Sequence, residues 1–188
     1  AHSGLITQIP DATMIKDDYE FINRERYETQ YLVEFGDWLQ VGDQKFNTLT
    51  TACSYAANGG TVSVIADAYV NFYQALPRDK NITLDLNGHS VVMTIALETL
   101  GNDTILDSKG TGRLHNVRTN AVVNGATLTI ESGIFSSDAT YAIQNNGTMT
   151  VNDITLNTYG GISTGGTLTF NGGTVNGTSA RGIISSGY

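Results

Sequence analysis

The stretch at residues 126–130 reads ATLTI, and it returns as TMTV at 148–151 and as TLTF at 167–170. Apolar and small polar residues alternate in all three copies. A ladder of apolar residues at equivalent positions has spacings of 22, 22, 21 and 19, and its members are Leu84, Leu106, Leu128, Met149 and Leu168. A period of about 20 residues with this alternation is typical of a β-solenoid, in which each coil buries its apolar side chains against the next coil.

Each repeat contains two further short apolar runs, such as 134–135 and 142–143 after the first copy. Turn residues separate the runs, for example Asn124-Gly125 and the glycine pair 172–173, because these residue types tolerate positive φ. Three short strands per repeat predict an all-β fold, a right-handed parallel β-helix of about five coils over residues 81–188.

Residues 37–80 predict a strand–helix–strand cap on the first coil. The stretch 38–41 alternates like a short strand, Thr48 can serve as a helix N-cap, and Gly59-Gly60 can end the helix. One face of this helix would carry five apolar residues, Leu49, Ala52, Cys53, Tyr55 and Ala56. Such a cap would cover the unpaired N–H and C=O groups that the first coil of a β-stack exposes.

Residues 1–36 form a polar and weakly patterned lead-in. One interpretation is an arm that lies on a surface or moves freely. The other is a segment that docks the repeat array to another component. This is favoured by residues more apolar than a plain tail needs, Phe21, Ile22, Tyr27, Tyr31, Leu32 and Phe35. The pattern leaves both interpretations open.

The chain carries 18 acidic and 10 basic residues, for a formal net charge of −8. This balance argues against nucleic acid and against an anionic membrane surface as partners, because both require clustered Lys and Arg. Cys53 is the only cysteine, so it forms no internal disulfide, and we expect it to be a small buried residue. The sequence contains no apolar run of about 18 residues that would predict a membrane-spanning helix.

The segment from Leu39 to about Ile134 resembles a module of extracellular surface proteins of gut Firmicutes. The matching pieces are VGD at 41–43, TL at 48–49, GTV at 60–62, KNITLDLNG at 80–88 and NGATLTI at 124–130. The resemblance implies the pectin-lyase-like β-helix superfamily, which includes lyases, hydrolases, adhesins and phage tailspikes. It therefore implies a fold more narrowly than a function.

One acidic patch is a candidate catalytic or cation site. The ladder places Asp85 directly beside Asp107, with Asp103 near them, and adjacent carboxylates either repel or share a cation. The same region holds four basic or titratable residues, Lys109, Arg113, His115 and Arg118. A polysaccharide lyase or hydrolase acting on acidic glycans through Asp85, Asp107 and Arg113 is therefore one hypothesis.

A structural role for these residues is the competing interpretation, and the sequence favours it. An Asp next to a turn can bond the backbone nearby. His89 follows the turn Asn87-Gly88 and has no acidic, Ser or Cys partner near it in sequence, so we expect it to face solvent or pack on the turn. We therefore assign no catalytic, cofactor or metal residue and expect no cofactor.

The last residues, 181–188, read as a strand that leads into another coil. Because an uncovered coil is prone to aggregate, we expect continuation of the chain, stacking of a second subunit or packing in a homo-oligomer. The leading hypothesis is a non-catalytic fibre or attachment module outside a bacterial cell or on a phage virion. A carbohydrate-binding module that uses the Thr and Asn faces is a further alternative.

Overall fold

The computed structural model describes residues 19–24, 29–34, 36–139, 141–177 and 182–185. The chain divides into two compact units, residues 1–36 and residues 37–188. In the first unit, strands β1 (Tyr19–Arg24) and β2 (Thr29–Glu34) form an antiparallel hairpin. The proposed docking role of this lead-in stays a prediction.

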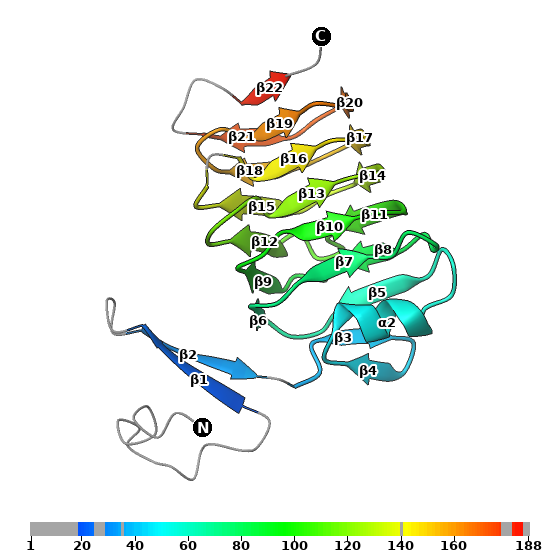
Figure 1. Cartoon of the computed structure of the whole chain (residues 1–188), viewed down its shortest axis with the longest axis vertical. Helices are drawn as coiled ribbons and strands as arrows, with labels where there is room; N and C mark the ends of the chain where they lie inside the picture. The colour runs from blue at the N-terminus through cyan, green and yellow to red at the C-terminus, as the bar shows by residue number, and fades with distance from the viewer. Residues whose placement is uncertain (1–18, 25–28, 35, 140, 178–181, 186–188) are drawn as a thin grey trace. The chain divides into compact units, whose positions relative to one another are not determined.

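The second unit is a right-handed parallel β-solenoid in which three sheets run the length of the stack (Figure 1). The parallel strands of sheet 1 are β5 (Thr61–Val64), β8 (Thr83–Asp85), β11 (Asn102–Leu106), β14 (Thr127–Ile130), β17 (Thr148–Val151) and β20 (Thr167–Phe170). Those of sheet 2 are β6 (Ala68–Val70), β9 (Ser90–Met93), β12 (Arg113–Asn116), β15 (Ile134–Ser137), β18 (Thr155–Asn157) and β21 (Thr174–Asn176). Those of sheet 3 are β7 (Gln74–Leu76), β10 (Leu97–Thr99), β13 (Val122–Asn124), β16 (Ile143–Asn145), β19 (Ile162–Thr164) and β22 (Ile183–Ser185).

The solenoid has six coils in its described part, so the predicted number of five is wrong. The additional coil consists of β5, β6 and β7, which pair in parallel with β8, β9 and β10. Its sequence lacks the Thr-x-Thr motif of β14, β17 and β20, so its first strand falls at the end of the predicted cap at 37–80. The array begins at Thr61, about one repeat before the expected start at Asn81.

The strand register corrects part of the predicted ladder. Leu84 lies beside Ile105, whereas Leu106 lies beside Asp85. Ile105 then lies beside Ile130, 25 residues later, which places Leu128 beside Asp103. The turn 107–112 between β11 and β12 is longer than the turn 131–133 of the following coil, and the predicted period of 22 did not allow for it. The predicted alignment of Leu128, Met149 and Leu168 is confirmed.

The interior consists of stacked apolar columns and one polar ladder. The largest fully buried side chains include Leu86, Ile105, Leu128 and Phe135. In sheet 3, Thr99 donates to Asn124 Oδ1 (2.9 Å), Asn124 donates to Asn145 Oδ1 (2.7 Å), and Asn145 donates to Thr164 Oγ1 (2.9 Å). All four are buried. Because each amide finds a partner in the next coil, the ladder ties adjacent coils together without unsatisfied polar groups.

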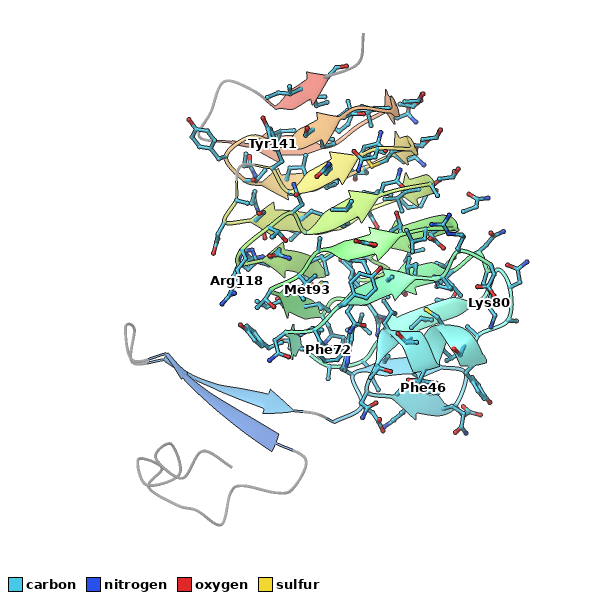
Figure 2. The ribbon with its side chains drawn as sticks, viewed as in Figure 1. Phe46, Phe72, Lys80, Met93, Arg118 and Tyr141 are labelled. Atoms are coloured by element: carbon cyan, nitrogen blue, oxygen red, sulfur yellow. The ribbon has the colours of Figure 1, made fainter. Side chains whose placement is uncertain are left out.

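A strand pair and a helix cover the first coil, whereas the last strand of the predicted cap is β5 of the solenoid itself. Strand β3 (Leu39–Val41) pairs antiparallel with β5 and with β4 (Gln44–Phe46). Helix α2 (Leu49–Tyr55) begins after Thr48, whose hydroxyl accepts a hydrogen bond from the Thr51 N–H. Figure 2 shows Phe46 and Lys80 at this end of the stack.

Helix α2 is anchored at both ends by side chains from the first coil. At its start, the Leu49 N–H donates to Gln74 Oε1 (3.2 Å). At its end, Lys80 Nζ donates to the carbonyls of Cys53 (3.0 Å), Ser54 (2.7 Å) and Ala56 (2.8 Å). A lysine satisfies carbonyls that a helix C-terminus otherwise leaves without partners.

The apolar face of α2 matches the prediction at four of its five residues. Leu49, Ala52, Cys53 and Ala56 are buried, whereas Tyr55 is 59% exposed. The Tyr55 ring packs on Phe46 of β4 at a centroid distance of 5.3 Å, so it lies outside the solenoid core.

The coil farthest from the cap buries its inward-facing residues less completely than the others. Leu168, Phe170 and Val175 are only partly buried, and Ile183 is 42% exposed. The equivalent residues one coil earlier, Met149, Val151 and Leu156, have no exposed surface. No helix in the described part of the chain has the length and apolar character to cross a membrane.

Candidate functional site

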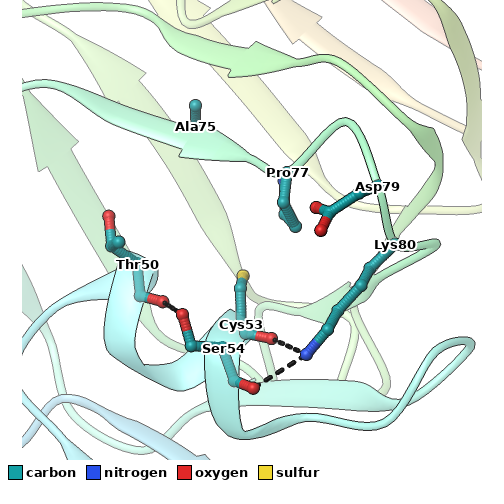
Figure 3. A pocket seen from close by; sticks show the side chains of 7 residues that line it. All are labelled: Thr50, Cys53, Ser54, Ala75, Pro77, Asp79 and Lys80. Carbon is teal, nitrogen blue, oxygen red and sulfur yellow. Dashed lines mark hydrogen bonds between the residues drawn. The ribbon is translucent and has the colours of Figure 1, made fainter.

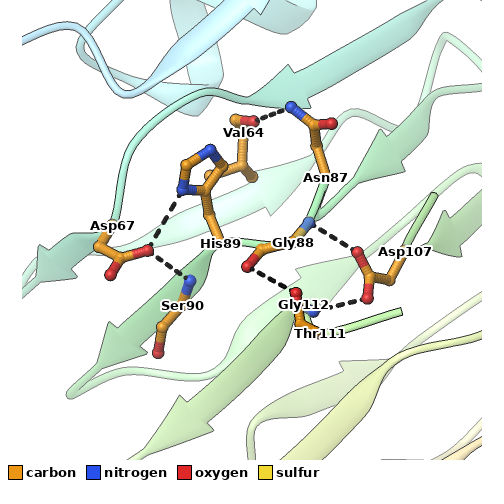
Figure 4. A network of polar contacts seen from close by, with 9 residues as sticks. All are labelled: Val64, Asp67, Asn87, Gly88, His89, Ser90, Asp107, Thr111 and Gly112. Atoms are coloured by element: carbon orange, nitrogen blue, oxygen red, sulfur yellow. Dashed lines mark hydrogen bonds and ion pairs between the residues drawn. The ribbon is translucent and has the colours of Figure 1, made fainter. Parts of the chain in front are cut away.

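The two carboxylates that the sequence placed side by side are not paired in the solenoid. Asp85 lies beside Leu106, so the predicted stacking of Asp85 on Asp107 is wrong. The Asp107 carboxylate is buried and accepts backbone N–H groups from Gly88 (2.7 Å) and Gly112 (2.5 Å), as Figure 4 shows. It therefore joins the turn after β8 to the turn after β11. Because it is buried, a substrate could not reach it.

Asp85 and Asp103 also accept backbone N–H groups. Asp85 Oδ1 accepts from Asn87 (2.8 Å) and from Ser108 in the next coil (3.0 Å). Asp103 points into the core at 1% exposure and accepts from Ile82 (3.0 Å) and Gly101 (3.1 Å). Burial raises the pKa of Asp103, and these N–H groups partly offset that shift. The structural interpretation thus accounts for all three residues, and no group of three or more His, Cys, Asp or Glu in the described part is placed to hold a metal.

His89 has an acidic partner that the sequence did not reveal. Its Nδ1 lies 3.3 Å from Asp67 Oδ1, and the same oxygen accepts the Ser90 N–H at 2.8 Å (Figure 4). Asp67 belongs to the preceding coil, 22 residues away, so only the strand register brings the two together. The pair lies at a turn and contains no nucleophile.

Arg113 and His115 meet on the outer face of sheet 2, where both contact Ser136. Arg113 Nε donates to Ser136 Oγ at 2.9 Å, and His115 Nδ1 lies 2.9 Å from the same oxygen. His115 Nε2 lies 3.6 Å from Asp138 Oδ1. His115 and Ser136 sit opposite each other on β12 and β15, so the register creates this cluster.

The side chains follow the order acid, base and nucleophile of a catalytic triad, namely Asp138, His115 and Ser136. This serine, however, cannot act as a nucleophile here. A catalytic serine needs an accessible oxygen and a base that takes its proton. Ser136 is only 2% exposed, and its oxygen already accepts the Arg113 N–H. The cluster is therefore a polar contact between adjacent coils.

We expect His115 to make the stability of the protein depend on pH. Burial, and then the charge of Arg113, lower the pKa of His115 below its usual 6.5. Between that lowered pKa and about 6.5 the unfolded chain binds the extra proton, so stability is full above this range and falls as the pH drops through it. Urea unfolding of the wild type and of His115→Gln from about pH 8 to about pH 5 isolates this contribution. Equal pH slopes for the two proteins would contradict the prediction.

The described residues form a hollow beside the cap, between α2 and the segment that leaves β7. Its volume is about 380 Å³, and Figure 3 shows the seven residues that line it, Thr50, Cys53, Ser54, Ala75, Pro77, Asp79 and Lys80. The Asp79 carboxylate has no hydrogen-bond partner among the described residues, whereas Lys80 bonds the end of α2. The sequence did not reveal this site, because its residues come from separate segments of the cap and the first coil.

Comparison with known proteins returns no matching family, no matching curated protein and no matching solved structure. The parallel β-solenoid is therefore established by the strand pairing alone.

Proposed function

We propose that this chain is a non-catalytic structural module, a β-solenoid that serves as a fibre or attachment element on a bacterial cell surface or a virion. The observation that carries the proposal is the use made of the acidic side chains. Asp85, Asp103 and Asp107 each accept a backbone N–H from an adjacent coil. Carboxylates that could perform acid–base chemistry instead form hydrogen bonds that hold adjacent coils together.

Polar ladders on the surface support the same role. Asn152 donates to Glu131 Oε2 (2.8 Å), and Asn171 donates to Asn152 Oδ1 (2.8 Å). Asn176 donates to Asn157 in the same way (3.0 Å). Each bond joins equivalent positions of adjacent coils, so the surface also strengthens the stack along its axis.

We propose that a second copy stacks on the coil formed by β20, β21 and β22, because its inward-facing residues Leu168, Phe170 and Val175 are only partly buried. Exposed strand edges form hydrogen bonds readily with another sheet, and exposed apolar side chains pack against it. Sedimentation velocity over a range of concentrations tests for stacking of a second copy. We expect larger species at high concentration for the wild type and none for Leu168→Glu, which places a charge on the inward face of β20.

Thr169→Glu is the matched control, because the adjacent residue faces outward on the same strand and is exposed. It should assemble like the wild type, and circular dichroism should show the same strand content in all three proteins. A wild type that stays monomeric at every concentration would refute assembly through this end.

The competing enzymatic hypothesis has a direct test. A lyase acting on acidic glycans releases unsaturated uronates, and a hydrolase releases new reducing ends. We expect neither product from a panel of acidic polysaccharides. Turnover that disappears in Arg113→Gln would replace the structural proposal with an enzymatic one.

A further inference from the structure

The hollow beside the cap has the dimensions of a small-ligand site. Its volume of about 380 Å³ falls within the range of about 300–1,000 Å³ that is usual for such sites. Its walls are Thr50, Cys53 and Ser54 of α2, Ala75 of β7 and the turn that follows β7. Because α2 is fixed at both ends by Gln74 and Lys80, these walls are held in place without a ligand.

Apolar groups form much of the lining. Cys53 is 3% exposed, and Ala75 and Pro77 lie near it (Figure 3). Burial, and then the charge of Asp103, raise the pKa of the Cys53 thiol to about 12, so the sulfur is uncharged at neutral pH. A protonated buried thiol behaves as a small apolar group.

Two polar side chains with unused hydrogen-bonding capacity line the hollow. In Figure 3, Thr50 and Asp79 lie at opposite sides of it. Neither the Thr50 hydroxyl nor the Asp79 carboxylate has a hydrogen-bond partner in the described part of the chain. The hollow therefore offers a donor and acceptor on one side and a charged acceptor on the other.

Lys80 balances the charge of Asp79 without forming a hydrogen bond to its carboxylate. All three ammonium protons of Lys80 are donated to carbonyls at the end of α2. Its positive charge nevertheless stays beside the hollow, so the site as a whole is close to neutral. Lys80 would repel a cation and Asp79 would repel an anion. An uncharged ligand is therefore the best match for this site.

We propose that this hollow binds one unit of a neutral saccharide, with the sugar ring packed on Ala75 and Pro77 and its hydroxyl groups bonded to Asp79 and Thr50. A carboxylate accepts strong hydrogen bonds from hydroxyl groups, and the C–H faces of a sugar ring pack on apolar side chains. The inference rests on the attachment function proposed above and names the class of ligand for it.

Titration followed by ¹⁵N–¹H correlation spectra tests the site, with D-glucose, D-galactose and N-acetyl-D-glucosamine as probes. We expect at least one sugar to shift resonances of residues 50–54 and 75–80. Asp79→Leu should weaken that binding about tenfold or more, and Thr50→Val by a smaller factor, because each variant loses hydrogen bonds to the ligand. Asp153→Leu removes an exposed carboxylate between β17 and β18 and is the matched control, for which unchanged binding is expected.

The site inference is overturned if none of the three sugars shifts these resonances, or if Asp79→Leu binds as the wild type does. Methylammonium chloride serves as a cationic probe, and binding of this probe alone would replace the neutral ligand with a cation. Sedimentation of the same samples reports assembly independently. Loss of sugar binding with assembly intact would refute the site and leave the structural module standing.

Discussion

Asp107→Ala is expected to lower the free energy of unfolding by about 2–6 kcal/mol, since a buried N–H group left without its partner costs about 1–3 kcal/mol. The buried N–H of Gly112 and the partly buried N–H of Gly88 lose their acceptor in this variant, whereas the N–H of exposed Lys109, 3.4 Å from Asp107 Oδ1, can bond to water instead. The free energy of unfolding of Asp107→Asn should lie between those of the wild type and Asp107→Ala. An amide keeps one acceptor oxygen but presents an NH₂ group to one of the donors. Urea unfolding followed by circular dichroism measures the change.

Asp85→Ala provides the comparison for this prediction. Asp85 also accepts two backbone N–H groups, but its partner Ser108 is exposed and can bond to water instead. We expect about 1 kcal/mol or less from Asp85→Ala. Equal effects of the two substitutions would show that burial of the turn after β11 does not decide the role of Asp107.

Repeats of similar length explain why much of the fold was predictable. From β14 onward the coils have 21 and 19 residues and keep the same Thr-x-Thr strand, so Leu128, Met149 and Leu168 aligned correctly. The prediction failed where a false repeat coincided with a long turn. Leu84-Asp85 and Leu106-Asp107 are identical pairs, yet they lie one residue out of register. Because side chains alternate between the two faces of a strand, a shift of one residue reverses which side faces inward.

The polar contacts were less predictable than the strands, because each depends on the length of a whole coil. His115 meets Ser136 over 21 residues, His89 meets Asp67 over 22, and Lys80 meets Ser54 over 26. An error of one residue in any turn removes such a pair. The hollow beside α2 depends on the same lengths, since it joins the helix to the end of β7.

Gly147→Ala is expected to destabilise the solenoid strongly, because adjacent coils lie very close together at this position. A Cβ atom at this position would lie 2.0 Å from the carbonyl oxygen of Ala126 in the preceding coil. That oxygen accepts the Thr148 N–H at 2.8 Å, so it cannot move without breaking a bond of the β14–β17 ladder. Gly147→Ala should therefore lower the free energy of unfolding by about 3 kcal/mol or more. For a chain of this size that corresponds to a fall of about 6–12 °C in melting temperature.

Gly125→Ala separates this steric effect from the general consequence of replacing a turn glycine. Gly125 lies at the same corner one coil earlier, and its Cβ would meet nothing closer than 3.5 Å. Neither glycine has a positive φ, so a change within about 1 kcal/mol is expected for the control. Because coils of a solenoid are coupled mainly to their neighbours, hydrogen exchange in Gly147→Ala should accelerate in β17–β22 and stay slow in β8–β11. Uniform acceleration across all coils, or equal melting temperatures for the two variants, would show that close stacking at this corner does not hold the later coils in place.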